Sequence, residues 1–220
     1  MSNQITVSER TMRKLMREEG QGLYWTTDIN EELPIKMTTD GLASQPAMSL
    51  PQCLIRTAES QPTNTALAVK RQGHWQITTW RDYLVACRNF GRSLIKLGLT
   101  ERKAINIIGF NSPEWVISFY GAFFARMIPV GVYTTNLSDA CRYVADHSSA
   151  ELAVVENYDQ LKKYLEVWNT LPNLKYIVVY CETDKAKREE IKKMDRVMLW
   201  NDFLKIGKRA KSSVEDELDE

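Results

Sequence analysis

The second half of the chain alternates short apolar runs with longer amphipathic segments. Four runs are apolar on both faces of a strand, at about residues 105–108, 129–132, 152–155 and 176–180. The segments between them carry apolar positions at the spacing of a helix. Strands of this kind, separated by helices, are typical of a parallel sheet that is covered by helices. The pattern predicts an α/β fold with these four strands in one mostly parallel sheet, joined by right-handed helical crossovers.

The segment before this alternation predicts a hairpin and a long helix. "ALAVK" and "WQITT" are strand-like and flank the glycine of "RQGH", which suits a turn. The next stretch carries an apolar stripe at helical spacing from Trp80 to Leu97. Thr79 is a good N-cap with Asp82 three residues later, and Gly98 follows the last apolar turn as a stop. The stripe predicts a helix that packs into the core.

Three regions follow from the periodicity. Residues 1–50 have a weak pattern and end in turn-forming residues, which predicts an irregular lead-in. Residues 51–206 carry the periodic pattern and predict an α/β domain, with a short helix at its start and a further strand and helix at its end. Residues 207–220 are highly charged and have no apolar anchor, which predicts a disordered polar tail.

Charge and hydropathy narrow the class of protein. The 220 residues include 29 Lys and Arg and 28 Asp and Glu, for a net charge of +1. A nucleic-acid binder normally gathers a basic excess on one face, so no nucleic-acid partner is expected. The N-terminus has no apolar signal core, and no window approaches the roughly 18 apolar residues of a membrane span. A soluble, cytoplasmic protein is predicted. The basic stretch at residues 10–17 predicts a solvated helix, with contact to an anionic membrane surface as the alternative.

Cysteine and histidine give little sign of a metal or nucleophile site. No C-x-x-C spacing occurs, and His74 and His147 lie far apart in sequence. We therefore expect neither a metal site nor a disulfide framework. His74 is expected at the surface beside the hairpin turn, and His147 at a helix end. Buried or half-buried free thiols are expected at all four cysteines: Cys53, Cys87, Cys141 and Cys181.

The turn at residues 109–113 follows a strand and precedes a helix, which is where many α/β proteins hold a phosphate. Ser112 is the expected N-cap, and Pro113 removes one backbone donor. Glu114 adds a negative charge, and Gly109 is the single glycine. The turn is therefore predicted to be structural and to hold no phosphate. The helix that it starts is apolar almost all round, so we expect Trp115 to be largely buried. Neither G-x-x-x-x-G-K-[ST] nor G-x-G-x-x-G occurs, and the residues alone assign no activity.

Several segments together resemble the N-terminal part of a known enzyme family. They are "TTWRDYLVACRNFGRSLIKLGL", "AINIIGFNSPEWVISFYGAFFARMIPVGVYTTN", "ACRYVADHSSAELAVVEN" and "LPNLKYIVVY". In this order and spacing they resemble a long-chain acyl-CoA synthetase of the adenylate-forming superfamily. "VYTTN" resembles the bubblegum-type branch, since many other relatives have an Asn-Pro pair there. The resemblance covers roughly residues 23–210 and implies a partial large N-terminal α/β domain of an adenylate-forming enzyme.

The resemblance implies a two-step ATP-dependent ligase reaction. A long-chain fatty acid carboxylate attacks the α-phosphate of ATP, and CoA then displaces AMP from the acyl adenylate. The family uses Mg²⁺ and a phosphate-binding loop, T-S-G-T-T-G-x-P-K-G, which this sequence does not contain. No catalytic, cofactor-binding or metal residue is therefore carried over to any position. The resemblance implies action in the cytoplasm or peripherally on intracellular membranes.

Two hypotheses follow from the missing loop. The first is a fatty acid–CoA ligase that is cut short before its ATP-binding motifs, so that these residues are inactive alone. The second is a short, non-catalytic form that acts as a binding or regulatory module. A separate nucleotide-binding enzyme is disfavoured, because the turn at residues 109–113 is a poor anion site.

Overall fold

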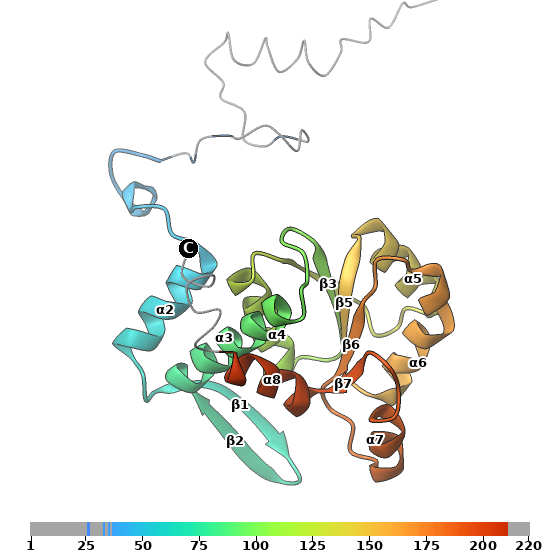
Figure 1. The fold of residues 1–220 in the computed structure, drawn as a ribbon. Helices are drawn as coiled ribbons and strands as arrows, with labels where there is room; N and C mark the ends of the chain where they lie inside the picture. Colours follow the sequence, from blue (N-terminus) through green and yellow to red (C-terminus); the bar gives the residue numbers. More distant parts are fainter. Residues whose placement is uncertain (1–25, 27–32, 34, 36, 211–220) are drawn as a thin grey trace, which may run out of the picture. The chain divides into compact units, whose positions relative to one another are not determined.

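The computed structural model describes residues 26, 33, 35 and 37–210 of the chain (Figure 1). Two compact units are present, residues 1–48 and residues 49–220. The described part of the first unit holds one short 3-10 helix, η1 (Leu42–Ser44). The basic stretch at residues 10–17 and most of the predicted polar tail lie outside the described residues.

A five-stranded parallel sheet forms the centre of the second unit. In space the strands follow the order β4-β3-β5-β6-β7, and all four pairings are parallel. Their bounds are β3 (Ala104–Ile108), β4 (Ile128–Val132), β5 (Ala150–Val155), β6 (Tyr176–Val179) and β7 (Val197–Leu199). The predicted α/β class and the four predicted parallel strands are confirmed, and β7 is the further strand expected near the end of the domain.

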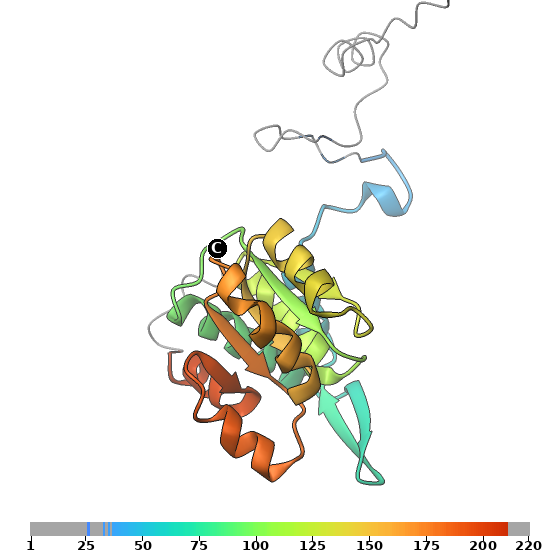
Figure 2. The same cartoon turned by 90° about the vertical axis from the view of Figure 1, so that its right-hand side faces the viewer.

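Helices cover both faces of this sheet (Figures 1 and 2). One face is covered by α2 (Leu50–Ser60), α3 (Trp80–Lys96), α4 (Pro113–Phe124) and α8 (Trp200–Arg209). The other is covered by α5 (Ser138–His147), α6 (Tyr158–Val167) and α7 (Lys185–Ile191), with the short η2 (Trp168–Thr170) after α6. Among the described residues, we find no helix with the length and apolar character needed to cross a bilayer.

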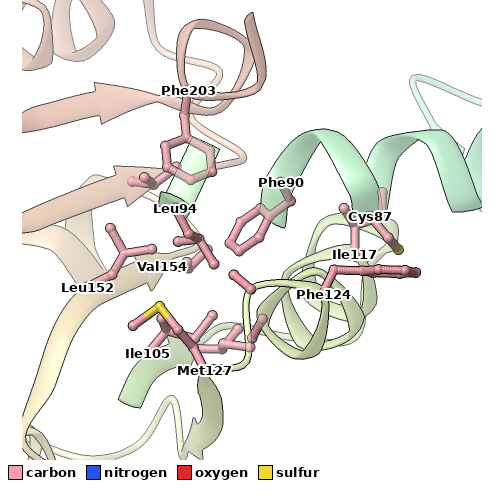
Figure 3. Close-up of a cluster of buried hydrophobic side chains, with 14 of the residues drawn as sticks. Cys87, Phe90, Leu94, Ile105, Ile117, Phe124, Met127, Leu152, Val154 and Phe203 are labelled. Atoms are coloured by element: carbon pink, nitrogen blue, oxygen red, sulfur yellow. The ribbon is translucent and has the colours of Figure 1, made fainter. Parts of the chain in front are cut away.

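The strands divide their side chains between two cores. Along β3, Ile105 and Ile107 point into the core under α3, α4 and α8, whereas Ala104 and Ile108 point into the other core. This alternation is the period of a strand. Figure 3 shows Phe90 and neighbouring side chains of the first core meeting across α3, α4, α8 and the sheet. Burial on both faces explains why the central strands β3 and β5 are mostly apolar at successive positions.

A separate antiparallel hairpin precedes α3, as predicted. It consists of β1 (Thr65–Arg71) and β2 (His74–Thr79), joined by Gln72 and Gly73. Both turn residues have positive φ, 50° and 82°, as a tight two-residue hairpin turn requires. The next helix begins as predicted, because the Thr79 side chain accepts a hydrogen bond from the Asp82 N–H.

The domain continues beyond residue 206, where the sequence pattern predicted its end. Helix α8 continues through Arg209, whereas the polar tail was expected from residue 207. Gly207 is buried against α3, and a Cβ there would overlap the backbone carbonyl oxygen of Asn89. The Ser93 hydroxyl accepts a hydrogen bond from the Gly207 N–H at 2.9 Å and donates one to the Phe203 carbonyl at 2.7 Å. Close packing of α8 on α3 therefore keeps this segment helical.

Candidate functional site

The carboxyl edge of the sheet is the place to search for a site. In open α/β sheets, ligands bind where loops from adjacent strands run to opposite faces. Here β3 continues into α4 on one face, and its neighbour β5 continues into α6 on the other. The crevice between the ends of β3 and β5 is the position that this topology indicates.

Protein side chains fill that crevice. A Cβ at Gly109 would overlap the hydroxyl of Tyr180 and lie 2.8 Å from the Cβ of Glu156. The Tyr180 hydroxyl donates to the carbonyl oxygen of Phe110 at 3.3 Å, and the Phe110 N–H donates to the Glu156 carboxylate at 3.1 Å. Burial raises the pKa of Tyr180, which keeps its phenol protonated. Gly109 is thus needed for the close approach of Tyr180.

The start of α4 is capped from within the protein. The Ser112 hydroxyl accepts a hydrogen bond from the Trp115 N–H at 3.2 Å, and Pro113 occupies the first helical turn. Glu114 is buried and accepts two hydrogen bonds from Arg71 of the hairpin, at 2.7 and 2.9 Å. This geometry supports the prediction that the turn at residues 109–113 is structural.

An open cavity of about 680 Å³ lies beside the filled crevice, over the ends of β3 and β4. Its walls come from the loop after β3, the first turn of α4, and the loop after β4. The lining residues are Gly109, Phe110, Asn111, Trp115, Gly131, Val132, Tyr133 and Thr134. None of these residues carries a charge. The volume lies within the roughly 300–1,000 Å³ typical of small-molecule sites.

Aromatic side chains form the wall and rim of this cavity. Trp115 is half-buried and stacks on Phe119, with ring centroids 5.7 Å apart and planes 16° apart. This partial burial agrees with the prediction that Trp115 is largely covered, since the side chain packs against the first core and also lines the cavity at the carboxyl edge. Gly131 lies against the indole, and a Cβ there would meet Trp115 Cζ2 at 3.5 Å, an ordinary contact distance. Phe110 and Tyr133 are 72% and 82% exposed at the rim.

The loop after β4 is held in place from α6. The Lys163 ammonium donates a hydrogen bond to the carbonyl oxygen of Thr134 at 2.7 Å. The contact joins α6 to a backbone acceptor 29 residues earlier in the chain. The lining therefore offers aromatic surface, the amide side chain of Asn111 and the hydroxyls of Tyr133 and Thr134, and no charged group.

A second cavity, of about 450 Å³, lies at the ends of β6 and β7 and is lined by charged residues. Each cationic side chain that lines it forms an ion pair or a hydrogen bond with a neighbouring acceptor. Arg71 pairs with Glu114 at 2.7 Å, and Lys205 pairs with Asp202 at 2.8 Å. Two further contacts are Lys192 with Glu189 at 2.6 Å and Arg188 with the carbonyl oxygen of Glu182 at 3.2 Å. These internal pairs make the second cavity a structural ion-pair network.

The histidines and cysteines do not come together in a site. His74 is exposed on the hairpin, and His147 is exposed at the end of α5, where its ring lies 5.7 Å from that of Tyr143. Within residues 26, 33, 35 and 37–210, no group of three or more His, Cys, Asp or Glu side chains is placed to hold a metal.

All four thiols are free. Cys87 and Cys141 are buried and Cys181 is half-buried, whereas Cys53 is exposed on α2, contrary to prediction. Burial raises the pKa of Cys87, Cys141 and Cys181 above the ordinary thiol value, so these side chains stay protonated. A protonated thiol is a weak nucleophile, and none of the three suits covalent catalysis.

Sequence comparison identifies relatives of known activity. The AMP-binding enzyme family matches residues 54–217. The long-chain-fatty-acid–CoA ligase ACSBG2 of Xenopus laevis is 35% identical over 194 residues, which cover 88% of this chain and 25% of the relative. The Gallus gallus ACSBG2 is 36% identical over 184 residues, covering 83% and 23%. ACSBG1 of Bos taurus is 33% identical over 174 residues, covering 79% and 24%. The chain spans about a quarter of the length of these relatives.

Solved structures share the fold. The anthranilate CoA ligase AuaEII, in complex with anthranoyl-AMP, superposes with a TM-score of 0.60 and 22% identity, covering 70% of this chain and 27% of that chain. The A domain of a carboxylic acid reductase from Segniliparus rugosus, with AMP and a carboxylic acid, gives a TM-score of 0.63 and 13% identity, covering 74% and 31%. The predicted fold, part of an adenylate-forming domain, is confirmed. The chain belongs to the AMP-binding enzyme family, and its relatives are bubblegum-type long-chain-fatty-acid–CoA ligases.

Proposed function

We propose that this chain forms part of a long-chain fatty acid–CoA ligase. The observation that carries the proposal is the 35% identity to a ligase of this name across 88% of the chain. In the proposed reaction, the fatty acid carboxylate attacks the α-phosphorus of ATP and pyrophosphate leaves. The CoA thiolate then attacks the acyl carbonyl and AMP leaves. The cofactors of the whole ligase are ATP, Mg²⁺ and CoA.

Within this scheme, the cavity over β3 and β4 takes the apolar part of the acyl substrate. Trp115, Phe110 and Tyr133 supply aromatic surface, and no lining residue is charged. Transfer of an alkyl chain from water to such a surface is favourable by about 25 cal/mol for each Å² removed from water. An anionic ligand would lose its hydration there without gaining a cation.

The described residues suit the phosphates of ATP less well than they suit an acyl chain. The first cavity offers no cationic side chain, and the cations of the second are paired with acidic groups or a carbonyl. A triphosphate needs positioned donors and cations, because charge builds on its oxygens as the bond breaks. We expect no ATP–pyrophosphate exchange by the 220 residues alone with Mg²⁺ and a long-chain fatty acid. Exchange above the rate without protein would contradict this.

The location and partners follow from the same proposal. Long-chain fatty acids divide between membranes and water, so the ligase acts in the cytoplasm and peripherally at membranes. A net charge of +1 gives no support to a nucleic-acid partner.

Displacement of a fluorescent fatty acid analogue by palmitate, below its micelle concentration, tests the acyl cavity. Trp115→Ala should weaken palmitate binding about tenfold, because it removes the largest apolar wall. The matched control is Trp75→Ala, which removes an indole that is 65% exposed on the hairpin and does not line the cavity. Equal affinity in the two variants would reject the cavity as the acyl site.

A further inference from the structure

The segment between β4 and α5 forms one wall of the cavity over β3 and β4, but burial does little to fix it. Tyr133 and Thr134 of this segment line the cavity. Its large apolar side chains face solvent, since Tyr133 is 82% exposed and Leu137 is 76% exposed. Only surface that is removed from water contributes hydrophobic free energy. Polar contacts must therefore hold residues 133–138 beside the cavity.

The segment supplies few of these contacts itself. The Asn136 N–H donates a hydrogen bond to the Tyr133 carbonyl at 3.1 Å, which closes one turn. Helix α5 then begins after Leu137, and among the described residues no side-chain hydrogen bond caps it. By contrast, the Ser112 hydroxyl caps α4, and the Asn157 side chain caps α6. The start of α5 is therefore less well fixed by its own sequence than the starts of these two helices.

Two side chains of α6 supply the missing contacts. Helices α5 and α6 lie side by side on the same face of the sheet (Figures 1 and 2). The Lys163 ammonium donates to the Thr134 carbonyl at 2.7 Å, and the Ser138 hydroxyl donates to the Glu166 carboxylate. Lys163 and Glu166 are three residues apart, which places them on one face of α6. Helix α6 thus holds the segment at both of its ends.

The two contacts differ in strength. Lys163 is half-buried, and a hydrogen bond from a charged donor is stronger than one between neutral groups. Glu166 is exposed, so water competes for its carboxylate. Neither side chain lines the cavity. Any effect of Lys163 or Glu166 on the affinity for a ligand in the cavity must therefore pass through residues 133–138.

We propose that Lys163, assisted by Glu166, is a positioning residue for the cavity over β3 and β4, because it orders residues 133–138 before the acyl chain binds. This inference rests on the proposed acyl function of the cavity. A segment that is already ordered in the free protein loses little freedom on binding, and the affinity is higher for that reason. Without the Lys163 ammonium, the ligand would have to impose the same order, and palmitate would bind more weakly.

Hydrogen exchange of the full 220-residue chain, without ligand, measures the ordering of residues 133–138 directly. Mass spectrometry of peptides that span this segment gives the rates. Lys163→Met keeps most of the side chain and removes the donor. It should speed exchange in these peptides about fivefold, the factor that corresponds to one hydrogen bond of about 1 kcal/mol. Lys163→Arg keeps a cationic donor and should restore the rate to within about twofold of wild type.

Displacement of a fluorescent fatty acid analogue by palmitate then measures the effect on affinity. Lys163→Met should bind palmitate about fivefold more weakly than wild type, and Lys163→Arg should recover most of the loss. The matched control is Lys162→Met, since Lys162 is the next residue of α6 and pairs with Asp159 at the surface, at 3.1 Å. This control should change neither exchange nor affinity. Thermal melts of each variant check that the fold is retained.

Wild-type exchange at residues 133–138 in Lys163→Met overturns the proposal, because the contact would then not order the segment. Faster exchange with unchanged palmitate affinity overturns it as well, and so does an equal loss of affinity in Lys163→Met and Lys162→Met. The proposed acyl function fails separately, if Trp115→Ala binds palmitate as tightly as wild type. The exchange rates would still decide whether Lys163 orders the segment.

Discussion

Two neighbouring positions at the carboxyl edge of the sheet each contain a glycine. They differ in whether side chains fill the space beside it. Between β3 and β5, Tyr180 and Glu156 close the crevice over Gly109. Between β3 and β4, Gly131 lies under Trp115 and a cavity of about 680 Å³ stays open. A strand, a glycine and a helix therefore do not define a ligand site. The side chains that arrive from elsewhere in the sequence decide whether the position binds a ligand.

Exchanging the two glycines for alanine should give the largest effect. Gly109→Ala forces Tyr180 or the backbone to move, and overpacking of this kind lowers the free energy of unfolding by about 3 kcal/mol. Gly131→Ala meets Trp115 at an ordinary contact distance and should change it by less than about 1 kcal/mol. Urea denaturation of both variants measures the difference. Similar losses in the two would mean that the crevice at Gly109 is not filled as described.

The ion pair beside the closed crevice gives the next effect. Arg71→Gln leaves the buried Glu114 carboxylate without its cation and should lower the free energy of unfolding by about 2 kcal/mol. The control is Lys205→Gln, whose exposed pair with Asp202 should contribute less than about 0.5 kcal/mol. A double variant, Arg71→Gln with Glu114→Gln, should recover part of the loss. An Arg71→Gln variant as stable as the control would show that the pair does not hold the hairpin to α4.

Trp115 on the open side should matter less for stability than its size suggests. The side chain is half-buried, packs against the first core and borders a cavity, so Trp115→Ala should lower the free energy of unfolding by about 2 kcal/mol. A fully buried aromatic side chain would instead lose about 3–5 kcal/mol. A loss of the larger size, measured by urea denaturation, would mean that Trp115 is fully buried in the core and that no cavity lies beside it.

At the amino edge of the sheet, the carboxyl of Glu151 should make the free energy of unfolding depend on pH. Glu151 is buried, and burial raises the pKa of its carboxyl, but hydrogen bonds from Thr100 and the ion pair with Lys175 at 2.9 Å lower it more. The net pKa lies below the ordinary 4.5. The stabilisation is therefore present above that value and is lost as pH falls through the lowered folded pKa.

Comparison with Glu151→Gln isolates this carboxyl. As pH falls from about 6 to about 3, the free energy of unfolding of the wild type should fall by more than that of Glu151→Gln, because only the wild type loses the lowered carboxyl pKa. Parallel pH profiles of the two proteins would show that Glu151 has no lowered pKa.

The parts of the fold that sequence predicts are those set by neighbouring residues. The four parallel strands were predicted because each run is apolar at successive positions, and the start of α3 because Thr79 caps it locally. The filled crevice was not predictable in this way, because Tyr180 reaches Gly109 from 71 residues away in the chain. Glu114 was interpreted as a charge that repels an anion, and only the fold pairs it with Arg71.

The candidate site was less predictable than the fold. Trp115 lies on a helix that is apolar almost all round, and periodicity does not show which side meets a cavity. The signal that could have found the site is the pair of loops that follow β3 and β4. Parallel neighbouring strands bring such loops to one edge. Their aromatic residues, Phe110 and Tyr133, stand just beyond the strand ends.

Equilibrium dialysis of the chain against palmitate and Mg-ATP in parallel tests the central proposal most directly, that residues 37–210 form an acyl cavity and no phosphate site. We predict saturable binding of palmitate that Trp115→Ala weakens about tenfold, and no saturable binding of Mg-ATP. Saturable binding of Mg-ATP, with palmitate unbound or bound equally by wild type and Trp115→Ala, would contradict the account.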